Sequence, residues 1–203
     1  MNGIPENINH NFVREWVVPR ISSKRFKHVE GVVKAAGKIA GAYDCDVYLA
    51  ELAAWLHDAC KETKDKVLVE QAREYGIPLD PVLEKQGYLL HGPVAAELVK
   101  RELGITHPEL LAAIAEHTLG NVPMSKLSEV VFLADCLEES RPHDYTSPIW
   151  AALSIDDEIN VARAMLTATD LGLLHLMETA RPIHPLTVQV RNYYLERMKD
   201  SAN

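Results

Sequence analysis

Cysteine is scarce in this chain: three residues occur among 203, and no two of them form a Cys-x-x-Cys pair. An odd number of unpaired cysteines argues against a disulfide framework and fits a reducing compartment. The first residues also lack the basic and apolar regions of a secretory signal. We therefore expect a cytoplasmic protein.

Long hydrophobic runs and an excess of positive charge are also missing. Asp, Glu, Lys or His interrupts each apolar stretch before it reaches the length of a membrane span, so we expect no membrane partner. The formal net charge of −8 gives no general attraction for nucleic acid, and we expect none as a partner. A small phosphorylated ligand is compatible with this charge, because a few cations in one pocket suffice to hold it.

Strand-like alternation is nowhere convincing, whereas apolar residues recur at helical spacing along most of the chain. The sequence therefore predicts an all-α fold. Helix starts are expected at capping residues or at prolines suited to a first turn: Ser22 or Ser23, Asp46, Thr63, Asp80-Pro81, Gly92-Pro93, Thr106, Ser125 and Pro185. A long helix is predicted from about Asp156 to Thr179, and residues 141–148 are expected to form a connector.

The length of the chain is sufficient for one domain with a substantial core. We expect residues 1–203 to form a single domain in which C-terminal helices, over about residues 146–200, pack on the earlier bundle. Apolar residues expected to be exposed on these last helices would allow a homodimer: Leu174, Leu176 and Met177.

His57 and Asp58 stand side by side inside an apolar run that extends from Leu52 to Cys60, and a run so apolar predicts a buried helix on which the two residues are neighbours. Burying an imidazole next to a carboxylate costs several kcal/mol without compensation, and a metal ion is the usual compensation. A single histidine on an apolar helix is usually a core residue, so the prediction rests on the whole set. Comparable settings hold four more candidates: His28, His91, His117 and Asp135. Along the chain these residues occur in the order His, His-Asp, His, His, Asp, and this order predicts a metal-dependent hydrolase.

The mixed nitrogen and oxygen ligands suit Fe, Mn, Co, Ni or Zn better than Ca or Mg. One metal would be held by four of the candidates: His28, His57, Asp58 and Asp135. With its second oxygen Asp58 could bridge to another metal, held by His91 and His117. Two metals about 3.5–4 Å apart can share a hydroxide and polarise a phosphoryl oxygen.

Groups that could bind phosphate lie next to these candidates in the sequence: Arg25, Lys61, Thr118 and Arg141. Metals combined with such cations are what a phosphate-ester substrate requires. The remaining histidines stand in polar, terminal or capping contexts and are expected to be structural or exposed: His10, His107, His143, His175 and His184. Cys60 and Cys136 flank candidate ligands and are expected to be small core residues.

Several longer motifs surround the candidates: Arg25-Phe26-Lys27-His28, Leu56-His57-Asp58-Ala59-Cys60-Lys61, Leu90-His91-Gly92-Pro93, Ala115-Glu116-His117-Thr118, Ala134-Asp135-Cys136-Leu137-Glu138 with Arg141, and Thr187-Val188-Gln189-Val190-Arg191. With them the chain resembles the HD-domain phosphohydrolases, and within these the YqeK-like family, over about residues 24–195. One departure is visible, since Glu139 stands where that family often has proline.

The resemblance implies an HD-domain helical bundle, with a metal-binding core over about residues 24–141 and additional C-terminal helices. It implies symmetrical hydrolysis of diadenosine tetraphosphate to two ADP at a two-iron centre, with the same six metal ligands and the same phosphate contacts. Asp58, Asp135 and Lys61 would be catalytic. The expected partner is a small nucleotide: a dinucleoside polyphosphate as substrate and ADP as product.

Our hypothesis is that a hydroxide held between two metals attacks an inner phosphorus of the polyphosphate. Arg25, Lys61 or Arg141 would stabilise the leaving ADP, while Asp135 completes the first metal site. Two alternatives stay open. One is an HD nucleotidase acting on a dNTP, a nucleoside monophosphate or a guanosine alarmone. The other is a nucleotide sensor without turnover, which the presence of all six candidate ligands disfavours.

Overall fold

The computed structural model describes residues 2–155 and 158–200. Its α-helices are α1 (His10–Val17), α2 (Ser23–Ala42), α3 (Val47–Leu56), α4 (Asp65–Tyr75), α5 (Pro81–Lys85), α6 (His91–Leu103), α7 (Pro108–Glu116), α8 (Lys126–Leu137), α9 (His143–Leu153), α10 (Val161–Glu178) and α11 (Pro185–Asp200). Two 3-10 turns, Val18–Arg20 and Gly87–Leu90, accompany them. The predicted all-α fold is confirmed.

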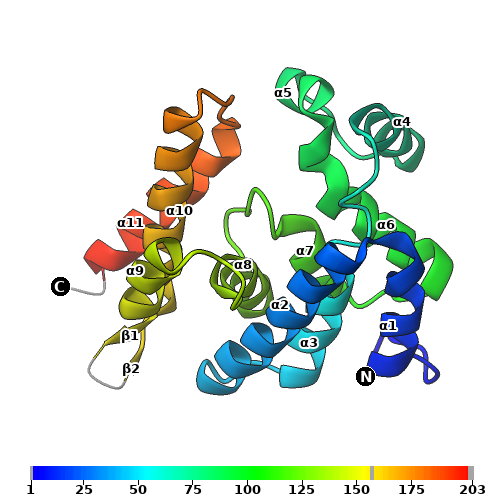
Figure 1. Ribbon diagram of the computed structural model, residues 1–203, viewed down its shortest axis with the longest axis horizontal. Coiled ribbons are helices and arrows are strands. Elements are labelled where there is room, and N and C mark those ends of the chain that lie inside the picture. The colour runs from blue at the N-terminus through cyan, green and yellow to red at the C-terminus, as the bar shows by residue number, and fades with distance from the viewer. Residues whose placement is uncertain (1, 156–157, 201–203) are drawn as a thin grey trace.

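The only strands in the described ranges are β1 (Ser154–Ile155) and β2 (Glu158–Ile159), an antiparallel pair that the sequence did not predict. In Figure 1, α2, α3, α7 and α8 lie in the centre, while α9, α10 and α11 lie together at one end. α10 contacts α8 as well as α9 and α11. α8 therefore lies between the central bundle and the C-terminal helices.

Helix starts follow the capping chemistry at most predicted positions. The side chains of Ser22, Asp46 and Ser125 accept backbone N–H groups at the starts of α2, α3 and α8, as predicted. Two predicted caps are wrong. α4 begins at Asp65, and its N-cap residue is Lys64, whose side chain makes no capping hydrogen bond, rather than Thr63. α7 is capped by Nδ1 of His107 rather than by Thr106.

The predicted connector over residues 141–148 is also wrong, because α9 starts at His143 and contains Pro148. Proline removes one backbone donor, yet Thr146, Ile149 and Leu153 around it are buried, and this packing keeps the helix. The long helix predicted from Asp156 begins only at Val161, and residues 156–157 lie outside the described residues. α1 was not predicted.

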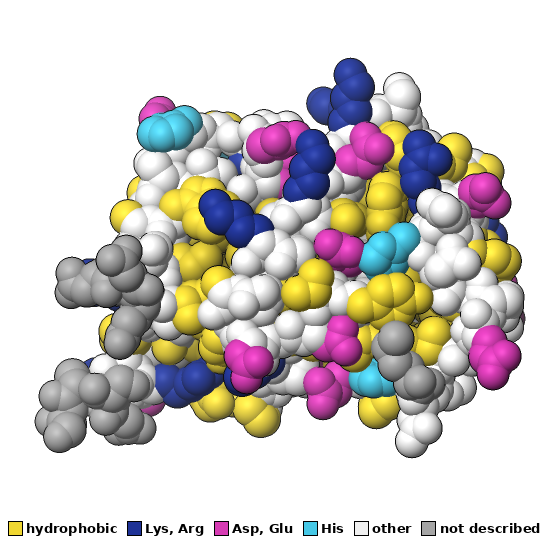
Figure 2. All heavy atoms as spheres, turned by 90° about the horizontal axis from the view of Figure 1, so that it is seen from below, with side chains coloured by type: hydrophobic (Ala, Val, Ile, Leu, Met, Phe, Trp, Pro, Cys, Tyr) yellow, Lys and Arg dark blue, Asp and Glu magenta, His cyan; other side chains and the backbone are white. Residues whose placement is uncertain are grey.

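The core is formed by apolar faces of the central helices. Its largest fully buried side chains include Leu52, Leu56, Leu110, Ile114 and Leu133. No helix among the described residues is long and apolar enough to cross a membrane. On the face seen in Figure 2, acidic and basic side chains are intermixed with apolar ones.

Candidate metal centre

Helix ends position most of the candidate ligands. His57 is the C-cap of α3 and His117 the C-cap of α7, whereas His91 is the first residue of α6. The prediction that His57 and Asp58 are neighbours on a helix is wrong, because α3 ends at Leu56 and Asp58 lies in the following turn. The apolar run continues beyond the helix because the turn itself is buried.

His28 comes from α2 and Asp135 from α8, so five separate segments meet here. Their junction depends on Gly92. A Cβ atom at this position would lie 2.9 Å from the carbonyl oxygen of Ile114 and 3.1 Å from the His117 ring. Because glycine has no side chain, the start of α6 can approach the end of α7 and bring His91 beside His117.

Asp58 is 2 % exposed and turns each carboxylate oxygen toward a different pair of imidazoles. Its Oδ2 atom lies 3.5 Å from Nε2 of His28 and 3.4 Å from Nε2 of His57. Its Oδ1 atom lies 3.3 Å from Nε2 of His91 and 3.6 Å from Nε2 of His117. This is the arrangement in which one carboxylate can bridge two metal ions.

The structure brings all six candidate ligands together. Asp135 Oδ1 lies 3.1 Å from Nε2 of His28, and its carboxylate also comes close to His57 and His117. Three overlapping groups, within each of which the ligand atoms lie within 4.8 Å of one another, could each hold a metal: His28, His57 and Asp58; His57, His117 and Asp135; and Asp58, His91 and His117.

The outer ring nitrogens fix how these imidazoles face inward. Nδ1 of His57 lies 2.6 Å from the carbonyl oxygen three residues earlier in the chain. Nδ1 of His91 and Nδ1 of His117 bond carbonyl oxygens at the same sequence spacing, at 2.6 and 2.8 Å. A carbonyl only accepts, so each Nδ1 carries a proton, and a ring without a second proton presents a bare Nε2 to the centre. Bare nitrogens there, such as those of His91 and His117 at 2.8 Å, repel without a cation between them.

Three buried polar atoms at the centre make no hydrogen bond in the described part of the chain: Nε2 of His28, Nε2 of His57 and Oδ1 of Asp58. Buried groups of this kind are costly unless they are paired or bind a metal. The donor set is histidine nitrogen and carboxylate oxygen, which suits a divalent transition metal. The residues present therefore fit the metal that the sequence predicts.

Charges within the cluster shift several pKa values. Burial alone would raise the pKa of Asp58, but His57 and its other imidazole neighbours outweigh burial and hold that pKa well below its usual range. Burial likewise opposes the effects of His28 and Arg141 on Asp135, whose pKa is also held well below its usual range. Burial lowers the pKa of His117 to about 4. Both acids are therefore ionised, and His117 is neutral, near pH 7.

Glu138 contacts the outer ring nitrogen of His28, which its local sequence did not reveal. It is 2 % exposed, and its Oε1 atom lies 3.0 Å from Nδ1 of His28. Ser140 donates to the same carboxylate through its backbone N–H at 2.7 Å and its hydroxyl at 2.6 Å. A Cβ atom at Gly31 would lie 2.7 Å from Oε2 of Glu138, so this glycine makes room for the acid against α2. Only its place in the motif that starts at Ala134 singled Glu138 out.

The four residues expected to bind phosphate all border the cluster. Nη1 of Arg25 lies 2.9 Å from Oδ2 of Asp58, and Nη2 of Arg141 lies 2.6 Å from Oδ1 of Asp135. Lys61 Nζ and Thr118 Oγ1 both lie 3.2 Å from Nε2 of His91. About a third of each of the three cationic side chains is exposed, so they can also reach a ligand.

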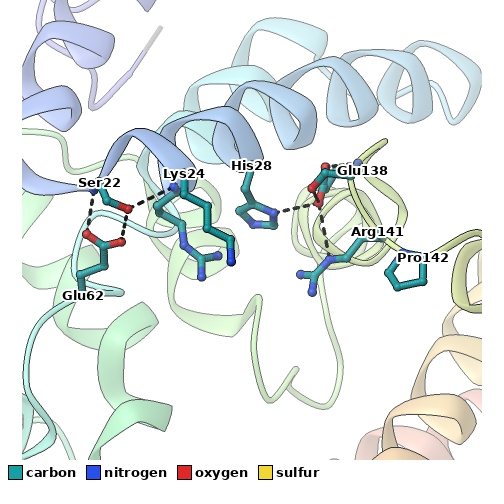
Figure 3. A pocket seen from close by; sticks show the side chains of 9 residues that line it. Ser22, Lys24, His28, Glu62, Glu138, Arg141 and Pro142 are labelled. Atoms are coloured by element: carbon teal, nitrogen blue, oxygen red, sulfur yellow. Dashed lines mark hydrogen bonds and ion pairs between the residues drawn. The ribbon is translucent and has the colours of Figure 1, made fainter.

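A cavity of about 480 Å³ opens beside the cluster on the side of α2. Figure 3 shows His28 between Lys24 and Glu138, with Lys24 and Arg141 reaching toward the opening from either side. The lining of this cavity is rich in charged and hydroxyl groups and includes Arg25 and Ser22. This cavity is suited to anionic groups.

The sequence profile of the HD domain matches residues 25–140 of this chain. The chain belongs to the HD domain family. The profile covers more than half of the chain and contains all six candidate ligands. The family predicted from the motifs is confirmed.

Three known proteins match this chain along most of its length. A symmetrical bis(5'-nucleosyl)-tetraphosphatase of Staphylococcus aureus (strain NCTC 8325 / PS 47) is 31% identical, over 89% of this chain and 93% of the relative. The protein of the same name from Bacillus subtilis (strain 168) is 29% identical, over 87% and 92%. A crystal structure described as a predicted HD superfamily hydrolase involved in NAD metabolism, from Clostridium acetobutylicum, superposes with a TM-score of 0.86 at 28% identity, over 94% of this chain and 98% of that one.

Proposed function

We propose that this HD-domain hydrolase cleaves diadenosine tetraphosphate symmetrically into two ADP. The chain is an HD-family phosphohydrolase that acts on a phosphoanhydride bond of a small nucleotide. The choice of substrate is supported by relatives named as symmetrical tetraphosphatases, which match this chain over most of both lengths. The chemistry rests on one observation above all: each oxygen of the buried Asp58 faces its own pair of imidazoles.

Two divalent metal ions, iron in our proposal, would be held by the six ligands. His28, His57, Asp58 and Asp135 would hold one ion, while Asp58, His91 and His117 would hold the other. When bound, such ions would supply Lewis acidity toward a phosphoryl oxygen and toward water.

The protein's own groups would then bind and orient the polyphosphate. Arg25 offers a partly exposed cation at Oδ2 of Asp58 and Lys61 offers one at Oδ1, while Arg141 offers another beside Asp135. These cations would offset the negative charge that develops on the leaving ADP. Asp135 would orient the attacking water, since its low pKa keeps the carboxylate ionised and able to accept a hydrogen bond. The Thr118 hydroxyl would donate a hydrogen bond to a phosphate oxygen.

The test is a product analysis with anaerobically purified, metal-loaded protein. Diadenosine tetraphosphate should give two equivalents of ADP and neither ATP nor AMP. A dNTP, a nucleoside monophosphate and a guanosine alarmone serve as competing substrates in parallel reactions. Faster turnover of one of these, or tight nucleotide binding without hydrolysis, would overturn the proposal.

A further inference from the structure

A second cavity, of about 310 Å³, lies between two walls of the protein and starts at the metal cluster, where His117 and Asp135 line it. We call it the α10 cleft. Lys61 and Tyr88 belong to one wall, and Tyr88 lies in the 3-10 turn that follows α5. The facing wall is formed by α10, α11 and the turn between them, which contribute His175, Leu176, Arg181 and Thr187. One route to the cluster therefore runs between these two walls.

The wall formed by α10 and α11 has little buried surface away from its base. Within residues 171–189, all of which the structure describes, His184 alone is buried, with 8 % of its surface exposed. Leu174 and Met177 are exposed, as expected, whereas Leu176, which was also expected to be exposed, is half-buried in the lining of the cleft. Segments with few buried contacts open locally at a lower free energy than the core does. This stretch is therefore the part of the cleft wall that can move.

At its base, α11 is fixed to the core through Glu129 of α8, a buried acid. Oε1 of Glu129 accepts from the Tyr194 hydroxyl at 2.8 Å and from Nη1 of Arg197 at 2.6 Å. Tyr194 and Val190 are fully buried, so this part of α11 belongs to the core. His184 lies about 15 Å from Tyr194 along the chain, since a helix rises about 1.5 Å per residue. The turn before α11 thus needs a contact of its own to stay in place.

A single side-chain contact holds this turn against the opposite wall. Nε2 of His184 lies 2.7 Å from Oδ2 of Asp80, the N-cap residue of α5, which is 104 positions earlier in the chain. In Figure 1, α5 and the turn between α10 and α11 lie on the same, upper side of the molecule. Among the described residues, no other hydrogen bond or ion pair joins residues 171–189 to the wall that follows α5. The two walls of the cleft therefore meet at His184 and Asp80.

Both partners are oriented for this contact by their own backbone surroundings. Oδ1 of Asp80 accepts the N–H groups of Val82 and Leu83, which leaves Oδ2 for His184. Nδ1 of His184 accepts the N–H group of Leu186 at 3.1 Å. A backbone N–H only donates, so Nδ1 carries no proton, and Nε2 carries the proton that is donated to Asp80. The contact therefore forms with a neutral imidazole and joins the starts of two helices.

We propose that α10 and α11 act as a lid over the α10 cleft, and that His184 and Asp80 form the latch that holds this lid closed on a bound ligand. The contacts of Glu129 are the fixed end of the lid, and opening breaks the bond between His184 and Asp80. The inference goes beyond the proposed function and rests on it only for the choice of ADP as the test ligand.

Asp80→Asn tests the latch from the wall opposite the lid. Asparagine caps a helix about as well as aspartate does, but its NH2 group cannot accept a hydrogen bond from Nε2 of His184. We expect amide hydrogen exchange in residues 171–189 to become about three- to tenfold faster, which corresponds to the loss of one hydrogen bond. Exchange in α2, α3 and α8 should stay unchanged. ADP should dissociate from the metal-loaded protein faster by a similar factor, as measured by stopped-flow displacement.

Glu84→Gln is the matched control, because Glu84 lies on the same helix as the Asp80 cap and its 2.9 Å ion pair with Arg73 of α4 does not cross the cleft. Exchange in residues 171–189 and ADP dissociation should both keep their parental rates in this variant. His184→Phe removes both nitrogens of the latch, keeps an aromatic ring, and should reproduce the exchange pattern of Asp80→Asn.

Unchanged exchange in both latch variants, or a rise spread equally over the central helices, would overturn the latch. Faster exchange confined to residues 171–189 without faster ADP dissociation would overturn its role in holding a ligand. Failure of the proposed function would look different: the unsubstituted protein would release no ADP from diadenosine tetraphosphate. In that case the exchange pattern still decides whether Asp80 and His184 keep the lid closed.

Discussion

Glu138→Gln should weaken metal binding although Glu138 is not itself a candidate ligand. The carboxylate accepts from Nδ1 of His28 at 3.0 Å and from two groups of Ser140 at 2.6 and 2.7 Å. It thereby holds the His28 ring with Nε2 toward Asp58 and Asp135. Glutamine keeps the size of the side chain but removes the negative charge that makes the imidazole a better ligand.

Removing an outer hydrogen-bond partner of a metal-binding histidine typically lowers metal affinity by about 10–100-fold, which we expect for the site that contains His28. One of the three hydrogen bonds to Glu138 would weaken, so the unfolding free energy should fall by only about 1 kcal/mol. Titration with Mn²⁺ or Co²⁺ by calorimetry separates the two sites, and chemical denaturation gives the stability. The matched control is Glu139→Gln, since Glu139 is exposed and, within the part of the chain that the structure describes, its side chain pairs only with Lys34.

Gly31→Ala probes the same contact from the other side. The added methyl carbon would lie 2.7 Å from Oε2 of Glu138, and such overpacking costs about 1–3 kcal/mol. The acid would have to move away from His28, so metal affinity should fall together with stability. Parental metal affinity in both Glu138→Gln and Gly31→Ala would refute the reasoning that Glu138 positions His28.

Other predictions concern single contacts. Gly92→Ala should lower metal content and melting temperature, because its Cβ would come within 2.9 Å of the Ile114 carbonyl oxygen. Tyr194→Phe should cost about 1–2 kcal/mol in denaturant unfolding, because it removes a buried donor 2.8 Å from Glu129. Burial, followed by the charge of Glu129, raises the pKa of Tyr43 to about 12. Because this pKa is higher in the folded state, its stabilising contribution is complete below pH 10 and is lost as the pH rises to 12. Tyr43→Phe should flatten the pH dependence of unfolding in that window, and an unchanged slope would contradict this cause.

Local chemistry allowed much of the fold to be predicted. A serine or aspartate before an apolar periodic stretch starts a helix for a reason visible in the sequence, and Ser22, Asp46 and Ser125 act in this way. The end of α3 could not be predicted, because the apolar pattern continues through the buried Ala59 and Cys60 after the helix has ended. α9 was missed because its Pro148 is held in place by tertiary packing.

The candidate site was also predictable in part: residues with a local sequence signal were found, and residues that only the fold brings to the site were not. Imidazoles and acids in apolar surroundings are conspicuous in a sequence, so the cluster itself could be predicted. Glu138 lies 110 positions from His28, and no local pattern predicts that contact. His175 was interpreted as structural or exposed because only the folded chain places it in the same cleft as Asp135 and Lys61.

The central claim is that one carboxylate, Asp58, joins two metal sites. The most direct test is the metal content per chain, measured by mass spectrometry after anaerobic loading and desalting, for the parent protein, Asp58→Ala and His91→Ala. We predict two ions in the parent, one in His91→Ala, and fewer than one in an Asp58→Ala variant that keeps its helicity and loses nearly all activity. Full metal content together with full turnover in Asp58→Ala would contradict the account.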